Sequence, residues 1–247
     1  MTQPNPWHVQ AGMAGRANDG PVRPGTVLGL LTIAGLGIWT TVALLSVVVL
    51  VLRIRILGEA GADPRQVDLS ALESNDSLLV LVAGLQGVLL FATAVLFCLW
   101  LLRARANAEA ILDHAQRWSR PWTVFGWVVP IANLWIPKQV VDDIWAISAG
   151  RSDAKPGSRP VMAWWACWLI YLIGDRIVAL GFQAEDGGLA AERDQAIASL
   201  ALMLPGVAAA ALAALVIWKI NGMQEAQAAR IQAAIAYPDT PPPAAEH

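Results

Sequence analysis

Charged residues are scarce in this chain. They make up 15% of its 247 residues, whereas hydrophobic residues make up 56%. A typical soluble domain carries about 25% charged residues, so this composition argues against a soluble globular protein. The formal net charge is −2, which gives no electrostatic basis for binding nucleic acid. The positive mean hydropathy of +0.51 instead favours a protein that lies in a membrane.

Cysteine and histidine are also rare. Cys98 and Cys167 both lie inside apolar runs, which argues against a disulfide framework and predicts small buried side chains. The three histidines, His8, His114 and His247, are far apart in the sequence, so we expect no histidine-based metal site. The chain also lacks the motifs GxxxxGK[ST], GxSxG and HExxH. We therefore expect no enzyme activity, no cofactor and no bound metal.

Four apolar runs are each long enough to cross a bilayer, which takes about 20 helical residues. They predict an all-α integral membrane helical bundle with four transmembrane helices. The first run exceeds the roughly 7–15-residue apolar core of a signal peptide, so we interpret it as a retained span. The predicted spans are residues 27–52, 78–102, 161–180 and 197–220, in a membrane domain of residues 26–222. Residues 1–25 are predicted to be a disordered tail, and residues 223–247 a tail that is disordered toward its end.

Lysine and arginine are distributed unevenly over the connections of such a four-span chain. The side that holds both termini and the connection between the second and third spans carries 12 of the 17 positive residues, and the other side carries four. Positive residues favour the cytoplasmic side of a membrane. We therefore predict a protein of the bacterial inner membrane with both termini in the cytoplasm.

Tryptophan is abundant, with 12 residues against two tyrosines and four phenylalanines. Most of these indoles lie near the predicted cytoplasmic boundary. Indole rings favour the headgroup level of a membrane, and they also fill contacts between helices. The pattern predicts a Trp-rich cytoplasmic rim in which both uses occur, formed by Trp100, Trp118, Trp122, Trp127, Trp135, Trp145, Trp164, Trp165, Trp168 and Trp218.

An apolar segment, residues 122–149, lies between the second and third predicted spans and is too interrupted to be a fifth. Pro130 disturbs a helix, and Asn133 is predicted to hydrogen-bond the backbone that this break frees. Pro137 suits the first turn of a new helix. We expect a short dip into the inner leaflet, followed by an amphipathic helix that packs on the spans or lies at the interface.

The predicted amphipathic helix has two distinct faces. Trp145 shares the apolar face, whereas Asp142 and Asp143 lie on the polar one. We interpret the acidic pair as a solvated face. A cation site or an acid–base pair is the alternative, but neighbouring helical residues point about 100° apart.

Two further sets of charges invite interpretation. Arg103 and Arg105 follow the second span and suit an anionic lipid surface at the inner leaflet, at about 1 kcal/mol each, or they simply set the topology. Asp175 and Arg176 are the only charged residues in the interior of a predicted span, since Lys219 lies at the end of the fourth. Because intramembrane charges are usually paired, we predict that Asp175 pairs with an arginine at the end of the first span, Arg53 or Arg55. A proton or ion site at Asp175 is the alternative.

Three segments of the sequence, RARANAEA, GWVVPIANLWIPKQVVDDIWAIS and WWACWL, resemble a bacterial membrane family described only as domain of unknown function 4328. The resemblance extends over about residues 75–220. It implies a multi-span protein and supplies no activity, substrate or catalytic residue. The chain departs from the pattern at Lys138, where an aromatic residue is common, and in its acidic pair. The residues that carry the pattern are Arg103, Arg105, Asn107, Pro130, Asn133, Pro137, Trp145 and Arg176.

Three functions fit these observations. The leading hypothesis is a non-catalytic scaffold or regulator that acts on an unknown protein partner, or on a second copy of itself, through the Trp-rich rim. The second is a small transporter or channel whose broken segment lines a cavity, with Gln86 as a polar group at mid-depth. The third is a membrane-embedded enzyme that uses Asp142, Asp143 or His114.

Overall fold

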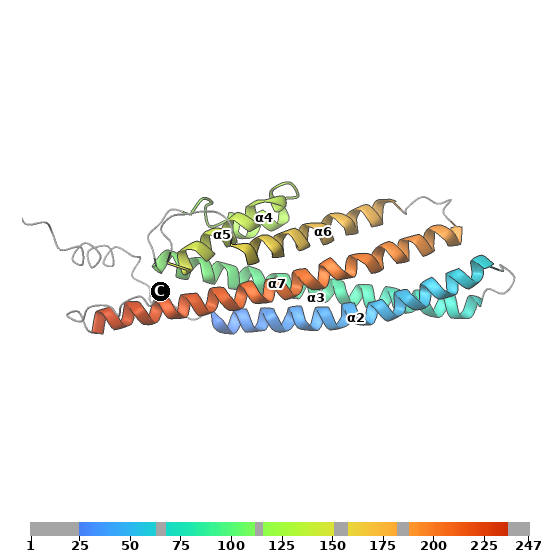
Figure 1. The fold of residues 1–247 in the computed structure, drawn as a ribbon, viewed down its shortest axis with the longest axis horizontal. Coiled ribbons are helices and arrows are strands. Elements are labelled where there is room, and N and C mark those ends of the chain that lie inside the picture. The colour runs from blue at the N-terminus through green and yellow to red at the C-terminus, as the bar shows by residue number, and fades with distance from the viewer. Residues whose placement is uncertain (1–24, 63–67, 112–115, 151–157, 182–187, 237–247) are drawn as a thin grey trace, which may run out of the picture. The chain divides into compact units, whose positions relative to one another are not determined.

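The computed structural model describes residues 25–62, 68–111, 116–150, 158–181 and 188–236. These residues form α-helices and one short 3-10 helix, and they contain no strand. The predicted all-α fold class is therefore confirmed. His114 and the predicted tails up to residue 24 and from residue 237 lie outside the described residues. The elements are α2 (Thr26–Ala62), α3 (Leu69–Ile111), α4 (Trp122–Val128), η2 (Ala132–Leu134), α5 (Ile136–Ser148), α6 (Arg159–Gly181) and α7 (Gly188–Ala236) (Figure 1).

Four of these helices, α2, α3, α6 and α7, are long and apolar enough to cross a membrane. Each contains one of the predicted spans and extends beyond it. The extension is longest in α7, which continues to Ala236, past the predicted end at residue 220. Its last turns are rich in alanine and glutamine, which form helices well without being apolar. Hydropathy therefore located the spans correctly and underestimated the lengths of the helices that contain them.

The chain divides into two units, each built from segments that are distant in the sequence. Unit 1 comprises the chain up to Leu30, Cys98–Ser158 and the chain from Ile217. Unit 2 comprises Leu31–Phe97 and Arg159–Val216. Helices α2, α3 and α7 contribute residues to both units. The broken segment between α3 and α6 belongs wholly to unit 1.

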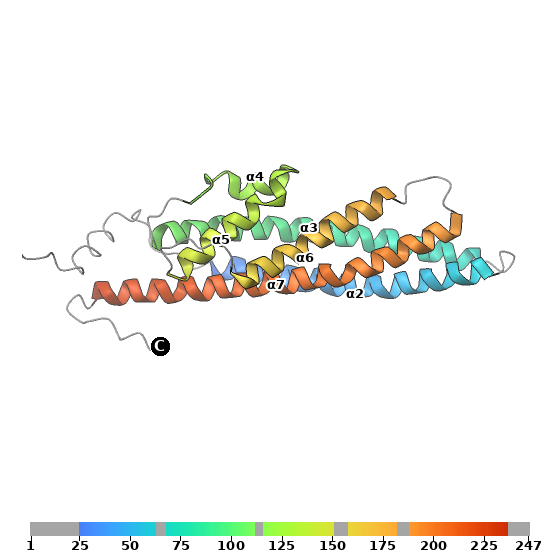
Figure 2. The ribbon, with the colours of Figure 1, turned by 45° about the horizontal axis from the view of Figure 1, so that its top comes forward.

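The interior of unit 2 is mainly apolar, and its helical segments run side by side (Figures 1 and 2). Trp39 and Ala43 of α2 pack with Ala210 of α7 in a buried cluster. The Tyr171 ring of α6 meets Trp39 edge-on, with ring centroids 6.0 Å apart. Gly206 makes room for this contact, since a Cβ atom there would lie 2.9 Å from the Tyr171 ring. Small residues of this kind let helices approach closely where no hydrophobic force drives them together.

A polar clamp joins three helices of unit 2. The Arg53 guanidinium donates to Glu192 at 2.7 Å and also pairs with Asp76, which connects α2 to α7 and α3. The prediction that Asp175 pairs with Arg53 or Arg55 is wrong, because Asp175 is exposed and makes no ion pair among the described residues. The prediction looked for the acidic partner of Arg53 or Arg55 only inside the apolar runs. Because α3 and α7 begin before those runs, they carry other carboxylates to Arg53.

Candidate functional site

Residues 122–148 form a helical hairpin in unit 1. The first helix, α4, ends at the extended residue Val129, whose ψ is 115°. This conformation is what the ring of Pro130 imposes on the residue before it. The second helix, α5, has Pro137 in its first turn, where a missing amide hydrogen costs nothing. The predicted broken segment followed by an amphipathic helix is confirmed.

The turn of the hairpin satisfies its backbone internally. The backbone amide of Asn133 donates to the Val129 carbonyl at 2.9 Å. The backbone amides of Leu134 and Trp135 donate to the carbonyls of Ile131 and Ala132. The prediction that the Asn133 side chain satisfies this backbone is wrong. Its Oδ1 atom is buried and has no hydrogen-bond partner among the described residues. The 3-10 turn brings backbone amides close to carbonyls three residues earlier, so these groups pair without the side chain.

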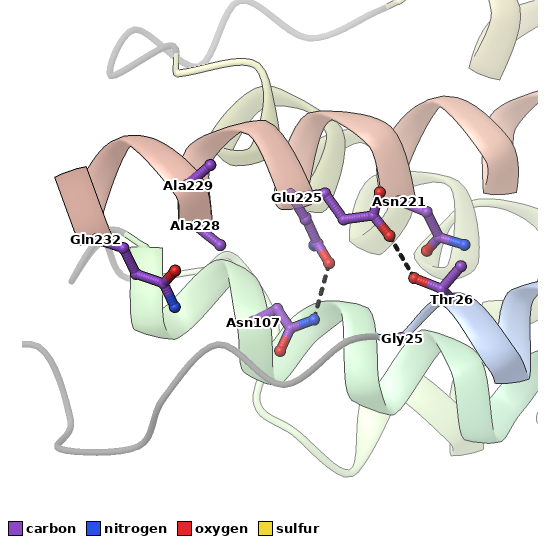
Figure 3. Close-up of a pocket in the computed structure, with 9 residues that line it drawn as sticks. Gly25, Thr26, Asn107, Asn221, Glu225, Ala228, Ala229 and Gln232 are labelled. Atoms are coloured by element: carbon purple, nitrogen blue, oxygen red, sulfur yellow. Dashed lines mark hydrogen bonds between the residues drawn. The ribbon is translucent and has the colours of Figure 1, made fainter.

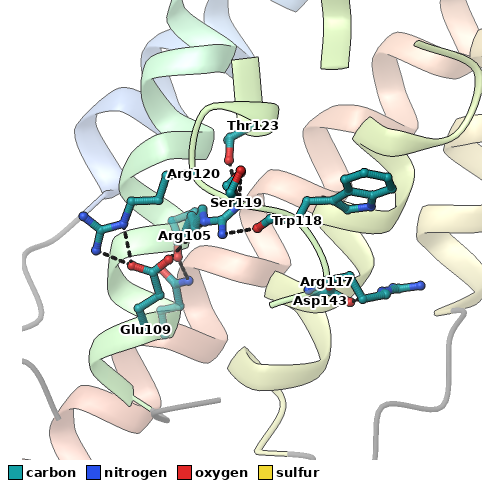
Figure 4. A network of polar contacts seen from close by, with 10 residues as sticks. Arg105, Glu109, Arg117, Trp118, Ser119, Arg120, Thr123 and Asp143 are labelled. Atoms are coloured by element: carbon teal, nitrogen blue, oxygen red, sulfur yellow. Dashed lines mark hydrogen bonds and ion pairs between the residues drawn. The ribbon is translucent and has the colours of Figure 1, made fainter. Parts of the chain in front are cut away.

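Arg105 holds the chain that precedes the hairpin. Its side chain is 5% exposed, and its Nε atom donates to Glu109 at 3.0 Å. The guanidinium also donates to the Thr123 hydroxyl at 2.9 Å and to the Trp118 carbonyl (Figure 4). The sequence predicts that Arg105 faces an anionic membrane surface or simply sets the topology, whereas in the structure it bonds protein groups in the interior of unit 1. A buried arginine requires such a set of acceptors, because an unpaired buried charge is costly.

Helix α5 holds the same stretch of chain, residues 116–121, from the other side. Arg117 donates to the Asp143 carboxylate at 2.6 Å, and the Trp118 indole donates to Gln139 at 2.8 Å. We call residues 116–121 the fastened loop. It has no regular secondary structure, and it is bonded to both α3 and α5.

The acidic pair of α5 is not solvated, contrary to the prediction. Asp142 and Asp143 are 5% and 9% exposed. Asp143 pairs with Arg117 of the fastened loop, and Asp142 pairs with Lys138 at 2.6 Å on its own helix. The helical wheel placed both carboxylates on a polar face correctly, but it contains no information about what packs on that face. The two carboxylates have separate cationic partners.

Glu109 connects the fastened loop to α3 a second time. It accepts hydrogen bonds from Arg105 and, at 2.9 Å, from Arg120. The hydrogen bonds from Arg120 to this carboxylate raise the pKa of the Arg120 guanidinium. Five charged side chains of unit 1 therefore hold one loop in place: Arg105, Glu109, Arg117, Arg120 and Asp143.

Asn107, the third member of the Arg-x-Arg-x-Asn motif, begins a separate polar chain. Its amide donates to Gln224 of α7 at 3.1 Å, and the Gln224 amide donates to the Ala104 carbonyl at 2.8 Å and to the Ser148 hydroxyl at 3.2 Å. This chain joins α3, α7 and α5. Sequence reasoning missed Gln224 because it lies beyond the predicted fourth span. The sequence signal that could have indicated this contact is a pair of side-chain amides, Asn221 and Gln224, about one helical turn apart.

A hollow of about 240 Å³ lies beside this polar chain (Figure 3). Thr26 of α2 donates to the Glu225 carboxylate across it. Asn107, Asn221, Gln224 and Gln232 also line the hollow, together with alanines of α7. Among the described residues, no group of three or more His, Cys, Asp or Glu side chains could hold a metal ion.

The predicted Trp-rich rim contains both buried tryptophans, which fill contacts between helices, and exposed ones. Trp100 is fully buried and its indole donates to Asn221 at 2.9 Å. Trp135 and Trp218 are exposed, by 43% and 65%. The rings of Trp118 and Trp122 lie 5.7 Å apart at the fastened loop. The indoles of this region therefore serve both as interior packing and as surface.

A family model described as domain of unknown function (DUF4328) matches residues 63–222, more than half of the chain. The chain belongs to this family. Comparisons with curated proteins and with solved structures gave no match. The DUF4328 match includes the fastened loop, the hairpin and Asn107.

In this DUF4328 chain, the structure brings most of the predicted site residues into unit 1. Arg105 and Asp143 meet at the fastened loop, whereas Asn107 takes part in the polar chain. Arg103 and Trp145 are half-buried, and Arg103 forms no ion pair with any residue that the structure describes. Residues Pro130, Asn133 and Pro137 shape the hairpin, Asp142 pairs within α5, and Asp175 and Arg176 are exposed in unit 2.

Proposed function

We propose that this chain is a non-catalytic membrane scaffold or regulator that binds a partner protein through the fastened loop and the indole rings beside it. The observation that supports the proposal is that residues 116–121 are bonded to both α3 and α5. Buried and half-buried side chains of α3 and α5 hold a loop without regular structure in one conformation. Loops positioned by a rigid framework commonly carry binding functions.

The composition of this surface supports a protein partner. The side chains of Arg117 and Arg120 are 41% and 65% exposed. In the sequence, Arg117 precedes Trp118, and Arg120 lies between Trp118 and Trp122, whose rings pair. Tryptophan and arginine are the residues that most often dominate the energetics of protein interfaces. Each arginine already has a carboxylate partner, which fixes its position and weakens its attraction for anionic headgroups.

We place the fastened loop on the cytoplasmic side of a bacterial inner membrane. The support is the uneven distribution of lysine and arginine along the sequence. Reporter fusions after Arg120 should then report the cytoplasm, whereas fusions after Asp68 and Gly188 should report the outside. The opposite pattern would contradict this orientation.

Two contacts favour a scaffold over the alternatives. Gln86, the mid-depth polar group that a transporter would need, donates to Ser46 at 2.9 Å and so joins α2 to α3. Asp142 and Asp143, the acid–base pair that an enzyme would need, each bond a different cation. These polar groups therefore contribute to packing within their units.

Photo-crosslinking tests the proposal in cells that produce the full chain. Ser119 is exposed in the fastened loop, so a photo-crosslinking residue there should yield one discrete product that contains a partner protein. The same residue at Ile235, which is 76% exposed on α7 of unit 1, is the matched control and should not yield it. Adding Arg105→Gln should loosen the loop and reduce the yield of product relative to the amount of folded chain in the membrane.

Two outcomes would contradict the scaffold. One is a chain that gives no product at Ser119 and purifies in mild detergent without a stoichiometric partner. The other is a product of equal yield at Ser119 and Ile235, which would indicate non-specific contact. A small molecule that is retained through purification would favour transport.

A further inference from the structure

The first helix of the hairpin runs back along α3 toward its apolar part. Arg120 contacts Glu109, and three residues later Thr123 contacts Arg105, one turn earlier in α3 (Figure 4). At 1.5 Å per residue, the end of α4 at Val128 lies about 8 Å beyond Thr123. An equal distance along α3 leads from Arg105 to the level of residues 100–102, which belong to a predicted span.

The second helix of the hairpin returns to the charged end of α3. Ser148, the last residue of α5, accepts a hydrogen bond from Gln224, which also bonds the Ala104 carbonyl. The entry and the exit of the hairpin therefore lie at the same level of α3. The turn between the two helices is the part that lies deepest along the apolar helix.

This turn combines an apolar surface with a backbone that is partly paired within the turn. The sequence contains no charged residue between Arg120 and Lys138. Phe125, Val128 and Ile131 are 59%, 71% and 69% exposed. The backbone amides of Asn133, Leu134 and Trp135 pair with carbonyls of the turn itself. Irregular backbone at membrane depth must be covered by protein, so only the exposed apolar side chains of the turn can meet hydrocarbon.

We propose that the turn of the hairpin is a lipid-binding wedge, in which Phe125, Val128 and Ile131 insert among the acyl chains of one leaflet. The leaflet is the one on the side of the fastened loop, and the hairpin does not cross the membrane. The occupant is bilayer lipid because the wedge lies level with exposed apolar residues of α3, Leu99 and Leu102, which are 47% and 38% exposed in the same unit. The inference is independent of the partner-binding proposal, and it gives the fastened loop a fixed depth at the membrane surface.

Nitroxide labelling tests the wedge in the full chain, reconstituted into vesicles of phosphatidylcholine and phosphatidylglycerol. Single cysteines replace Val128 or Ile131 in a background in which Cys98 and Cys167 are alanine. The matched control is Arg120→Cys, a position of similar exposure at the base of the hairpin. Labels at the wedge should collide with oxygen more often than with a water-soluble nickel chelate, and the label at the control should show the reverse.

A depth standard makes the test more stringent. A label at Leu99→Cys on α3 should give the same depth as the label at Val128→Cys. Labels at Val128 and Ile131 that collide freely with the nickel chelate would place the turn in water and overturn the wedge. Labels that collide with neither reagent, or a depth beyond the bilayer midplane, would identify a protein contact or a crossing and would overturn it equally.

Discussion

Unit 1 and unit 2 hold their helices together by different means. In unit 1, side chains such as Arg105 and Gln224 bond several elements at once. In unit 2, buried polar side chains are fewer, and much of the interior is formed by rings and small residues, as in the contact of Trp39, Tyr171 and Gly206. Directional bonds select one arrangement, because each buried donor needs its own acceptor, whereas apolar packing tolerates exchange among side chains of similar volume. Unit 1 is therefore the part whose geometry is fixed most specifically.

The largest effect is expected from removing the buried arginine of unit 1. Arg105→Leu leaves the Trp118 carbonyl without its donor and removes one of the two arginines that donate to the Glu109 carboxylate. Breaking a buried ion pair from one side costs about 3–5 kcal/mol, so thermal unfolding in detergent should shift strongly and the fastened loop should become sensitive to protease. Arg103→Leu, two residues earlier and half-buried, is the control and should cost less than about 1 kcal/mol. Equal losses would mean that the fastening does not stabilise unit 1.

The next effect concerns the close contact in unit 2. Gly206→Ala places a methyl group 2.9 Å from the Tyr171 ring, and overpacking of this kind costs about 1–3 kcal/mol. Gly87→Ala is the control, because nothing lies within 4 Å of its added methyl group. That change should be neutral or stabilising by up to about 1 kcal/mol. If Gly206→Ala is also neutral in thermal unfolding, then the ring contact can relax and unit 2 is less tightly packed than the structure indicates.

A smaller effect is expected in the polar chain of unit 1. Asn107→Ala removes one bond to Gln224, which keeps its bonds to Ala104 and Ser148. Hydrogen bonds between membrane helices contribute about 0.6 kcal/mol on average. A double-mutant cycle with Gln224→Ala should therefore give a coupling of about that size. Strict additivity in thermal unfolding would show that the two amides do not interact.

The smallest effect is expected at Asn133. Its buried oxygen has no partner among the described residues, so Asn133→Leu should leave stability unchanged or raise it. Thr123→Val is the comparison, because it removes a hydroxyl that accepts from Arg105 and should cost about 1–2 kcal/mol. A loss at Asn133 as large as the loss at Thr123 would show that the amide has a binding partner in the membrane.

The sequence by itself determined the local features of this protein. Four apolar runs predicted four long helices, because only a helix satisfies its own backbone in hydrocarbon. Pro130 and Pro137 predicted where the broken segment ends one helix and begins another, since proline restricts its own neighbourhood whatever surrounds it. The motif residues also placed the chain in the DUF4328 family.

Only the tertiary structure decided which polar groups meet. The helical wheel put Asp142 and Asp143 on one face, but the fastened loop that covers this face comes from another part of the chain. Arg53 pairs with Asp76 and Glu192 because α3 and α7 extend beyond their apolar runs, and hydropathy cannot locate the ends of a helix in its polar part. Periodicity tells which residues share a face, whereas their partners depend on how distant segments pack. That packing buried the acidic pair expected to be solvated, and turned Arg105 inward to hold the fastened loop.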